Sequence, residues 1–254
     1  MTYFKTIIRL ILIEAVRSRL PWLLLIVIVV SFGLSQFLGQ VAIIEHREIQ
    51  ATLQGAFLRV TAVFIIATFV ITSMVREAND KVTELLLSQP AARATYYFGK
   101  LAGYATVAAL VAVIFALPLV FFAPLPALLA WTISLACELS MMAAMSLFCV
   151  LSLTQILPAL SATAAFYLLG RSLAAMKLIA AASVATKPTF ADQAISAMVG
   201  AVSLVLPSID QMTISEWLVS APSVERLLTA VGQAILFTAL LAAASLFDVY
   251  RKNL

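Results

Sequence analysis

The chain has 254 residues, of which 63% are hydrophobic and only 11% are charged. A soluble globular domain carries about 25% charged residues, so this composition excludes a soluble fold and predicts a polytopic membrane protein. The net charge of +4 is distributed along the chain without a long basic run, so we expect no nucleic-acid partner. The apolar runs do not alternate with polar residues, which excludes a transmembrane β-barrel and predicts an all-α fold.

Residues 1–19 are predicted to form an amphipathic helix that lies in the headgroup plane of the membrane. Its charged residues are Lys5, Arg9, Glu14 and Arg17. Its apolar residues, which recur at helical spacing, are Phe4, Ile7, Ile8, Ile11, Leu12, Ala15 and Val16. Basic residues on such a helix lie near anionic headgroups, so membrane lipid is an expected partner. The alternative is a simple N-terminal extension of the first span.

Six apolar segments are long enough to cross the bilayer, which takes about 20 helical residues. They are approximately 20–39, 57–75, 100–122, 127–151, 155–172 and 228–248. Pro118 is expected to kink the third span. Short turns at 124–126 and 152–155 are predicted to join the third, fourth and fifth spans. The whole chain, 1–254, is expected to form a single transmembrane domain.

Residues 173–227 are predicted to form an external or re-entrant helical cap before the last span. Their most apolar part, 190–206, is interrupted by Asp192, Gln193, Ser196, Gly200 and Ser203. The alternative is a seventh span, which would place the two termini on opposite sides of the membrane. Basic residues in the loops are more numerous on the side of the N-terminus, which predicts that both termini are cytoplasmic.

The polar segment 76–100 lies between the second and third spans and is the strongest indication of a soluble partner. Residues 76–88 have a helical composition, and Glu77 precedes Lys81 by four residues, a favourable spacing for an exposed ion pair. Asp80 and Glu84 fall on another face, and Pro90 is expected to end the helix. From these residues alone, the alternative is an ordinary interhelical loop with a solvated charged face.

The same segment resembles the permease subunits of type-2 ABC exporters, in which a motif E-x-x-x-x-T-x-E-x-L-L-S-x-P-x-x-R, then G-K, follows the second span. The residues here that fall near this motif are Glu77, Thr83, Glu84, Leu86, Leu87, Ser88, Pro90, Arg93, Gly99 and Lys100. Val82 and Thr83 replace its usual Gly-Thr step. Residues 206–212 resemble the L-P-N-L-x-x-F patch of the branch associated with maturation of multicopper enzymes, with Ser208 and Met212 replacing Asn and Phe.

The resemblance implies a permease of the bacterial cytoplasmic (inner) membrane without an ATPase of its own. The sequence has no G-x-x-x-x-G-K-[ST] loop, so ATP and Mg²⁺ are expected on a separate ABC ATPase and no cofactor on this chain. Two ATPase copies would pair with two permeases, expected as a homodimer. The helix after the second span would dock on the ATPase. The coupling residues implied are Glu77, Asp80, Lys81, Glu84, Arg93 and Lys100.

Charged residues within the spans are candidates for the translocation path. Glu138 lies near the middle of the fourth span, where a carboxylate is costly unless it is paired, protonated or turned to the bundle interior. It is therefore a candidate translocation-path or gating residue. The alternative is a neutral Glu138 hydrogen-bonded through Ser134 or Ser140. Arg59 and Arg171 are expected to extend to the headgroups.

Three other interpretations remain open. A non-transporting ABC permease would transmit ATPase motion to a periplasmic protein through the 173–227 cap. An ATP-independent channel or secondary transporter would require paired intramembrane charges or broken helices, and Glu138 is nearly alone. A membrane enzyme is least favoured because no constellation of His, Cys or carboxylate residues is evident. Cys137 and Cys149 lie in one apolar segment and the single His46 has no second ligand nearby, so no metal site is expected. Asp248 is expected to pair with Arg251.

Overall fold

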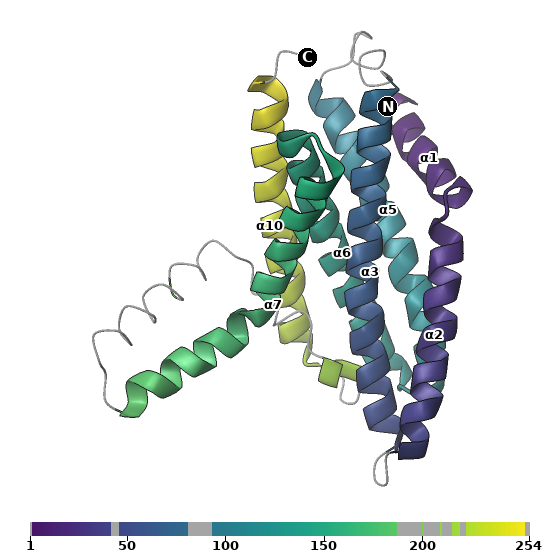
Figure 1. The fold of residues 1–254 in the computed structure, drawn as a ribbon, viewed down its shortest axis with the longest axis vertical. Helices are drawn as coiled ribbons and strands as arrows, with labels where there is room; N and C mark the ends of the chain where they lie inside the picture. The colour runs from purple at the N-terminus through teal and green to yellow at the C-terminus, as the bar shows by residue number, and fades with distance from the viewer. Residues whose placement is uncertain are drawn as a thin grey trace.

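The computed structural model describes residues 2–41, 46–80, 93–186, 200, 209, 215–218 and 222–251. These residues form α-helices joined by short turns, and no strand occurs among them (Figure 1). The α-helices are α1 (Thr2–Arg17), α2 (Leu20–Val41), α3 (His46–Asn79), α5 (Arg93–Ala116), α6 (Leu125–Leu153), α7 (Ile156–Thr186) and α10 (Val224–Arg251). Two 3₁₀ turns are η1 (Leu117–Phe121) and η2 (Ser215–Leu218). The predicted all-α fold is confirmed.

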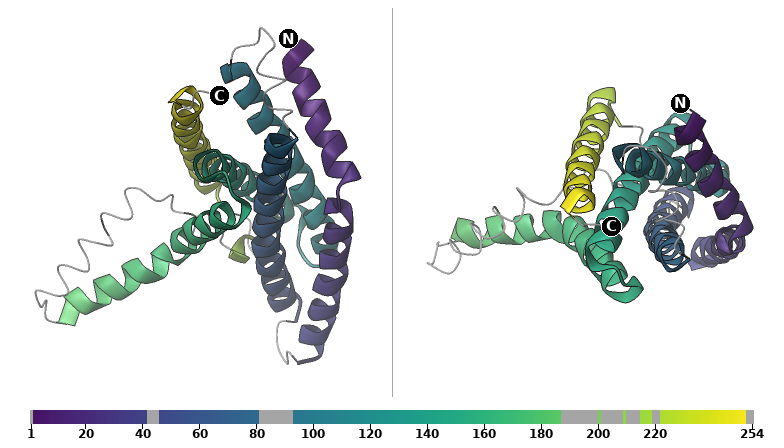
Figure 2. Two further views of the ribbon diagram at one scale, coloured as in Figure 1. Left: turned by 45° about the horizontal axis from the view of Figure 1, so that its top comes forward. Right: turned by 90° about the horizontal axis from the view of Figure 1, so that it is seen from above.

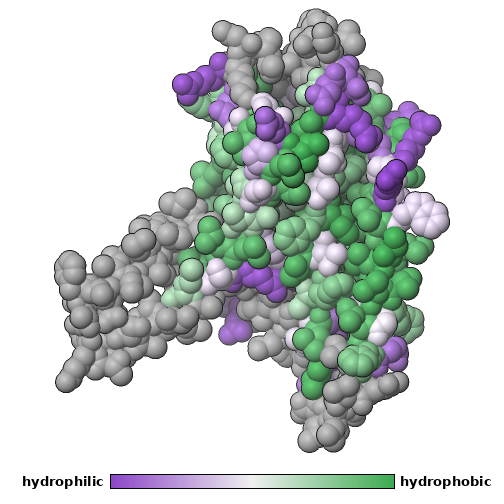
Figure 3. All heavy atoms as spheres, in the orientation of Figure 1, coloured by the Kyte–Doolittle hydropathy of each residue, from purple (hydrophilic) through white to green (hydrophobic). Residues whose placement is uncertain are grey.

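Six of these helices are long and apolar enough to cross a membrane, and they correspond to the six predicted spans. The chain is thus a multi-pass helical membrane protein. Helix α6 lies at the centre and packs against α3, α5, α7 and α10. Its fully buried side chains include Trp131, Leu135 and Leu139, whereas α2 and α10 expose most of their apolar residues. Figure 3 shows an apolar surface over the middle of the bundle, as contact with lipid requires.

The predicted N-terminal helix is confirmed as a separate helix, α1, which packs against α5 rather than continuing into α2. Ile7 and Ile11 of α1 lie over Gly99 and Gly103 of α5. A Cβ atom on Gly103 would stand 2.5 Å from Ile11 Cδ1, so any larger residue would force Ile11 to shift, and glycine favours this close approach of the two helices. Val16, which the spacing places with the apolar residues, does not join this contact and is 73% exposed.

Two boundaries differ from the prediction and one agrees with it. Pro118 does not kink a continuing helix, because α5 ends at Ala116 and Pro118 lies in the first turn of η1. The turn after α6 is short, as predicted, and Thr154 adopts a left-handed conformation there with φ of 58°. Helix α7 continues through Thr186, so the first part of the predicted cap extends the fifth span. Figure 2 shows this extension leaving the bundle.

The remainder of the predicted cap, including most of the 206–212 patch, lies outside the described residues. Its described parts are attached to the bundle: Ile209 is buried in the main core, and Leu218 of η2 packs at Gly55 of α3. Trp217 packs against Ala230 and Ala234 of α10. The choice between a cap and a seventh span therefore stays a prediction.

The first turn of α1 and the last turn of α10 lie at the same end of the bundle, together with the last turn of α3 and the first turn of α5 (Figure 1, top). This geometry agrees with an even number of crossings. The cytoplasmic location of that end stays a prediction.

Candidate functional site

A polar cluster joins the last turns of α3 to the first turns of α5, on either side of segment 81–92. The Glu77 carboxylate accepts a hydrogen bond from the Lys100 ammonium and another from the Tyr96 hydroxyl, at 3.0 Å. The Lys100 ammonium also lies 5.9 Å from the ring centres of both Tyr96 and Tyr104, within range of a cation–π interaction. We call Glu77, Tyr96, Lys100 and Tyr104 the hinge cluster.

The hinge cluster is largely removed from solvent. Lys100 is 6% exposed, and Tyr104 is fully buried and donates a hydrogen bond to Ser73 Oγ at 3.0 Å. Because a charge left unpaired in such an environment is costly, Glu77 and Lys100 hold each other in place. Burial, together with the negative charge of Glu77, raises the pKa of Tyr3, which belongs to α1. The cluster therefore fixes the ends of α3 and α5 and lies close to α1.

The predicted coupling residues fall into three groups. Glu77 and Lys100 come together in the hinge cluster, so Glu77 contacts α5, and its predicted pairing with Lys81 stays a prediction. Asp80 is exposed just beyond the end of α3. Lys81 and Glu84 lie outside the described residues, and so does the side chain of Arg93, whose backbone begins α5. Among the described coupling side chains, Asp80 is thus the one that a soluble partner could reach directly.

A second charged cluster lies in the middle of the bundle. Arg59 Nη1 of α3 lies 3.0 Å from Glu138 Oε2 of α6, and both side chains are fully buried. The same nitrogen donates to Ser134 Oγ at 3.3 Å, and the guanidinium carbon lies 5.3 Å from the Trp131 ring centre. The expectation that Arg59 extends to the headgroups is wrong, because its position on α3 faces α6 and Glu138 supplies the opposite charge.

Helix α7 completes this central cluster. Within α7, the half-buried Arg171 donates a hydrogen bond to the Tyr167 hydroxyl at 2.8 Å. Tyr167 is fully buried, and its ring meets Phe64 of α3 edge to face with centres 6.3 Å apart. Both residues of α7 are close enough to Glu138 to interact with it electrostatically. Glu138 therefore has charged and polar neighbours. The lack of a paired intramembrane charge, which counted against an ion-coupled transporter, no longer applies.

Sequence reasoning missed both networks for the same reason: it did not show which helix faces which. A usable signal was present in α5, where Tyr96, Lys100 and Tyr104 recur every four residues and so lie on one helical face. Gly99 and Gly103 also form a small-x-x-x-small pattern, typical of close helix packing. For Arg59 no spacing rule applies, because its partner lies on another helix.

Two smaller expectations also have outcomes. Asp248 was expected to pair with Arg251, whereas it accepts a hydrogen bond from the Ser152 hydroxyl at the end of α6. Within the part of the chain that the structure describes, no group of three His, Cys, Asp or Glu side chains is placed to hold a metal ion.

No family model matches this sequence, and no curated protein matches it. The function is therefore argued from the two clusters and from the motif around 76–100.

Proposed function

We propose that this chain is the membrane-spanning permease subunit of an ABC transporter, driven by a separate ATPase that docks on the segment between α3 and α5. The hinge cluster is the observation that carries this proposal. It ties the ends of α3 and α5 together at the base of the segment that resembles the exporter motif. A force applied to that segment would then move both helices as a unit.

The path from this segment into the membrane follows α3. This helix runs without interruption from His46 to Asn79 and bears Glu77 near its end and Arg59 near its middle. Arg59 is paired with Glu138 of α6, the helix against which the other spans pack. A displacement of α3 therefore reaches the centre of the bundle through a charged contact, as a two-state element driven from outside requires.

The remaining parts of the proposal follow the resemblance. Two copies of this chain act with two ATPase copies, which hold ATP and Mg²⁺, and the assembly exports a substrate across the bacterial cytoplasmic membrane. Both termini and the docking segment face the cytoplasm. The coupling roles of Asp80, Lys81, Glu84 and Arg93 are direct contacts with the ATPase, while Glu77 and Lys100 support the segment from below.

The test is co-purification of the tagged chain from its native cells in mild detergent, followed by ATPase assays. Asp80→Lys and Glu84→Lys should lose the ATPase or its activity while the chain still inserts into the membrane. Glu48→Lys is the matched control, since Glu48 is exposed in the first turn of α3, at the far end from the docking segment. Equal ATPase recovery in all three variants, or no ATPase with the unaltered chain, would contradict the proposal.

The extension of α7 favours a second candidate function, in which the permease transmits ATPase motion to a periplasmic protein without transporting a substrate. Helix α7 is held to the bundle centre by the buried ring of Tyr167, which meets Phe64 of α3, and it continues to Thr186, away from the other helices (Figure 2). A lever of this kind suits force transmission. Co-purification of a periplasmic protein, lost when α7 is shortened after Leu173, would favour this function over export.

A further inference from the structure

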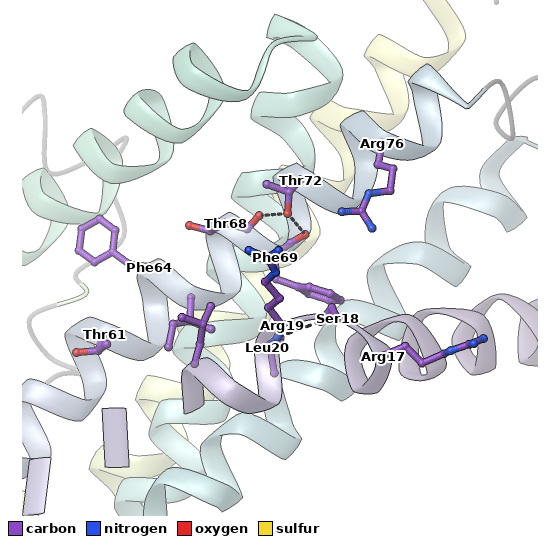
Figure 4. A pocket seen from close by; sticks show the side chains of 12 residues that line it. Arg17, Ser18, Arg19, Leu20, Thr61, Phe64, Thr68, Phe69, Thr72 and Arg76 are labelled. Carbon is purple, nitrogen blue, oxygen red and sulfur yellow. Dashed lines mark hydrogen bonds between the residues drawn. The ribbon is translucent and has the colours of Figure 1, made fainter. Parts of the chain in front are cut away.

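A groove of about 660 Å³ lies between the corner that joins α1 to α2 and the facing side of α3 (Figure 4). Its lining includes no residue of the hinge cluster and neither partner of the Arg59–Glu138 pair. Its lining residues are Arg17, Ser18, Arg19, Leu20, Leu23, Thr61, Phe64, Ile65, Thr68, Phe69, Thr72 and Arg76. The corner is held in shape by Ser18, whose hydroxyl donates to the Ala15 carbonyl at 2.8 Å and accepts from the Leu20 amide at 3.2 Å.

One end of the groove is strongly cationic. The guanidinium groups of Arg19 and Arg76 extend into the same space beside Thr72, whereas Arg17 extends away from them (Figure 4). None of these three arginines forms an ion pair with a carboxylate among the described residues. Arg76 also borders a smaller hollow that the carboxylates of Glu14, Glu77 and Asp80 line, so Arg19 is the less compensated of the two converging charges.

The rest of the groove is suited to hydrocarbon. Leu20, Leu23 and the aromatic residues Phe64 and Phe69 supply apolar walls. The hydroxyls of Thr61 and Thr72 do not need water, because each donates to a carbonyl of its own helix, at 2.7 and 2.6 Å. The groove thus combines a cationic end with an apolar wall, the complement of an anionic amphiphile.

The position of the groove identifies the source of that amphiphile. Arg19 immediately precedes the candidate span Leu20–Phe37, and Arg76 lies in the last turn of the candidate span Arg47–Asn79. Arginines at the ends of spans lie at headgroup level, and basic pockets between transmembrane helices are suited to anionic lipid headgroups. A second copy of this chain is disfavoured, because two-fold pairing through this face would bring its arginines close to one another.

We infer that the groove binds one anionic phospholipid, with its phosphate between Arg19 and Arg76 and an acyl chain along Thr61, Phe64 and Phe69 of α3. Guanidinium groups suit this role because they donate paired hydrogen bonds to phosphate oxygens. The bound lipid links the α1–α2 corner to α3. The inference rests on the groove alone and stands whether or not the proposed function is correct.

The test is native mass spectrometry of the purified chain, titrated in detergent with phosphatidylglycerol or phosphatidylcholine of identical acyl chains. The unaltered chain should retain phosphatidylglycerol preferentially, and Arg19→Gln/Arg76→Gln should weaken that retention by about tenfold or more. The matched control is Arg9→Gln/Arg251→Gln, which removes two exposed charges at the same end of the bundle outside the groove. The control should retain the preference.

Further variants and measurements distinguish a bound lipid from a free anion or a second copy of the chain in the groove. The Arg19→Lys/Arg76→Lys variant keeps both positive charges, and we expect it to retain part of the preference for phosphatidylglycerol. This result would show that the loss in the Gln variant is not caused by misfolding. Equal lipid retention in the Gln variant and the control would overturn the inference. So would displacement of the lipid by millimolar inorganic phosphate, which would indicate a site for a free anion. A dimer that dissociates only in the Gln variant would indicate a second copy of the chain in the groove.

Discussion

The buried pair between Arg59 and Glu138 makes a quantitative prediction about stability. Replacing either residue by leucine leaves its partner charged and fully desolvated in the middle of the bundle. Breaking a buried ion pair from one side costs about 3–5 kcal/mol, whereas replacing both partners with apolar residues is often neutral or stabilising. We therefore expect Arg59→Leu and Glu138→Leu each to destabilise the chain strongly. The double variant should lose far less stability than the sum of the two single losses.

The coupling free energy from this double-mutant cycle should be several kcal/mol, well above the error of the measurement. Reversible unfolding of the purified chain in mixed micelles is a suitable assay, and fluorescence of Trp131, 5.3 Å from the Arg59 guanidinium, provides a local probe. Ser134→Ala is the control, because it removes only the 3.3 Å hydrogen bond and should cost about 1 kcal/mol or less. Additive effects of the two leucine substitutions would refute the reasoning.

Three further predictions concern packing and the hinge cluster. Tyr96→Phe removes one hydrogen bond to the Glu77 carboxylate and should cost about 1.5–3 kcal/mol, measured by thermal unfolding; no change would mean that this bond contributes nothing. Gly103→Leu should release α1 from α5 and cost about 1–3 kcal/mol, detected as faster proteolysis of the N-terminus. Gly55→Leu should displace η2, since a Cβ there would stand 2.3 Å from a Leu218 methyl, and tryptophan fluorescence should shift. Gly33→Leu is the control: its side chain meets open space, so neither the proteolysis of the N-terminus nor the tryptophan fluorescence should change.

The sequence predicted well those features that depend on local composition. Segments of uninterrupted apolar residues have one stable state in lipid, the helix, so the six spans could be found without knowledge of their neighbours. Pro118 shows the limit of this approach, because proline is compatible both with a kink and with the first turn of a new helix. Only the packing of the following turn distinguishes the two.

The candidate site was harder to predict because its parts depend on pairing between helices. Glu138 stood out as a costly charge, but its partner Arg59 was assigned to the headgroups, because the predicted span began at about 57, whereas α3 begins at His46 and places Arg59 near its middle. Likewise the sequence offers Glu77 two basic partners, Lys81 four positions later and Lys100 at the end of the polar segment. The structure brings it to Lys100 because Tyr96 and Tyr104 offer that ammonium a desolvated aromatic site.

The two charged clusters share α3, and this has a mechanical consequence for the proposed function. Arg59 and Glu77 are 18 residues apart on one uninterrupted helix, a separation of about 27 Å along its axis. The upper contact joins α3 to α5 and the lower one joins it to α6, and both are ionic contacts that are costly to break. An uninterrupted helix with an ionic contact at each of these points connects them directly. Under the proposed function, motion of the docking segment would therefore be carried along α3 to its contact with α6 at mid-membrane.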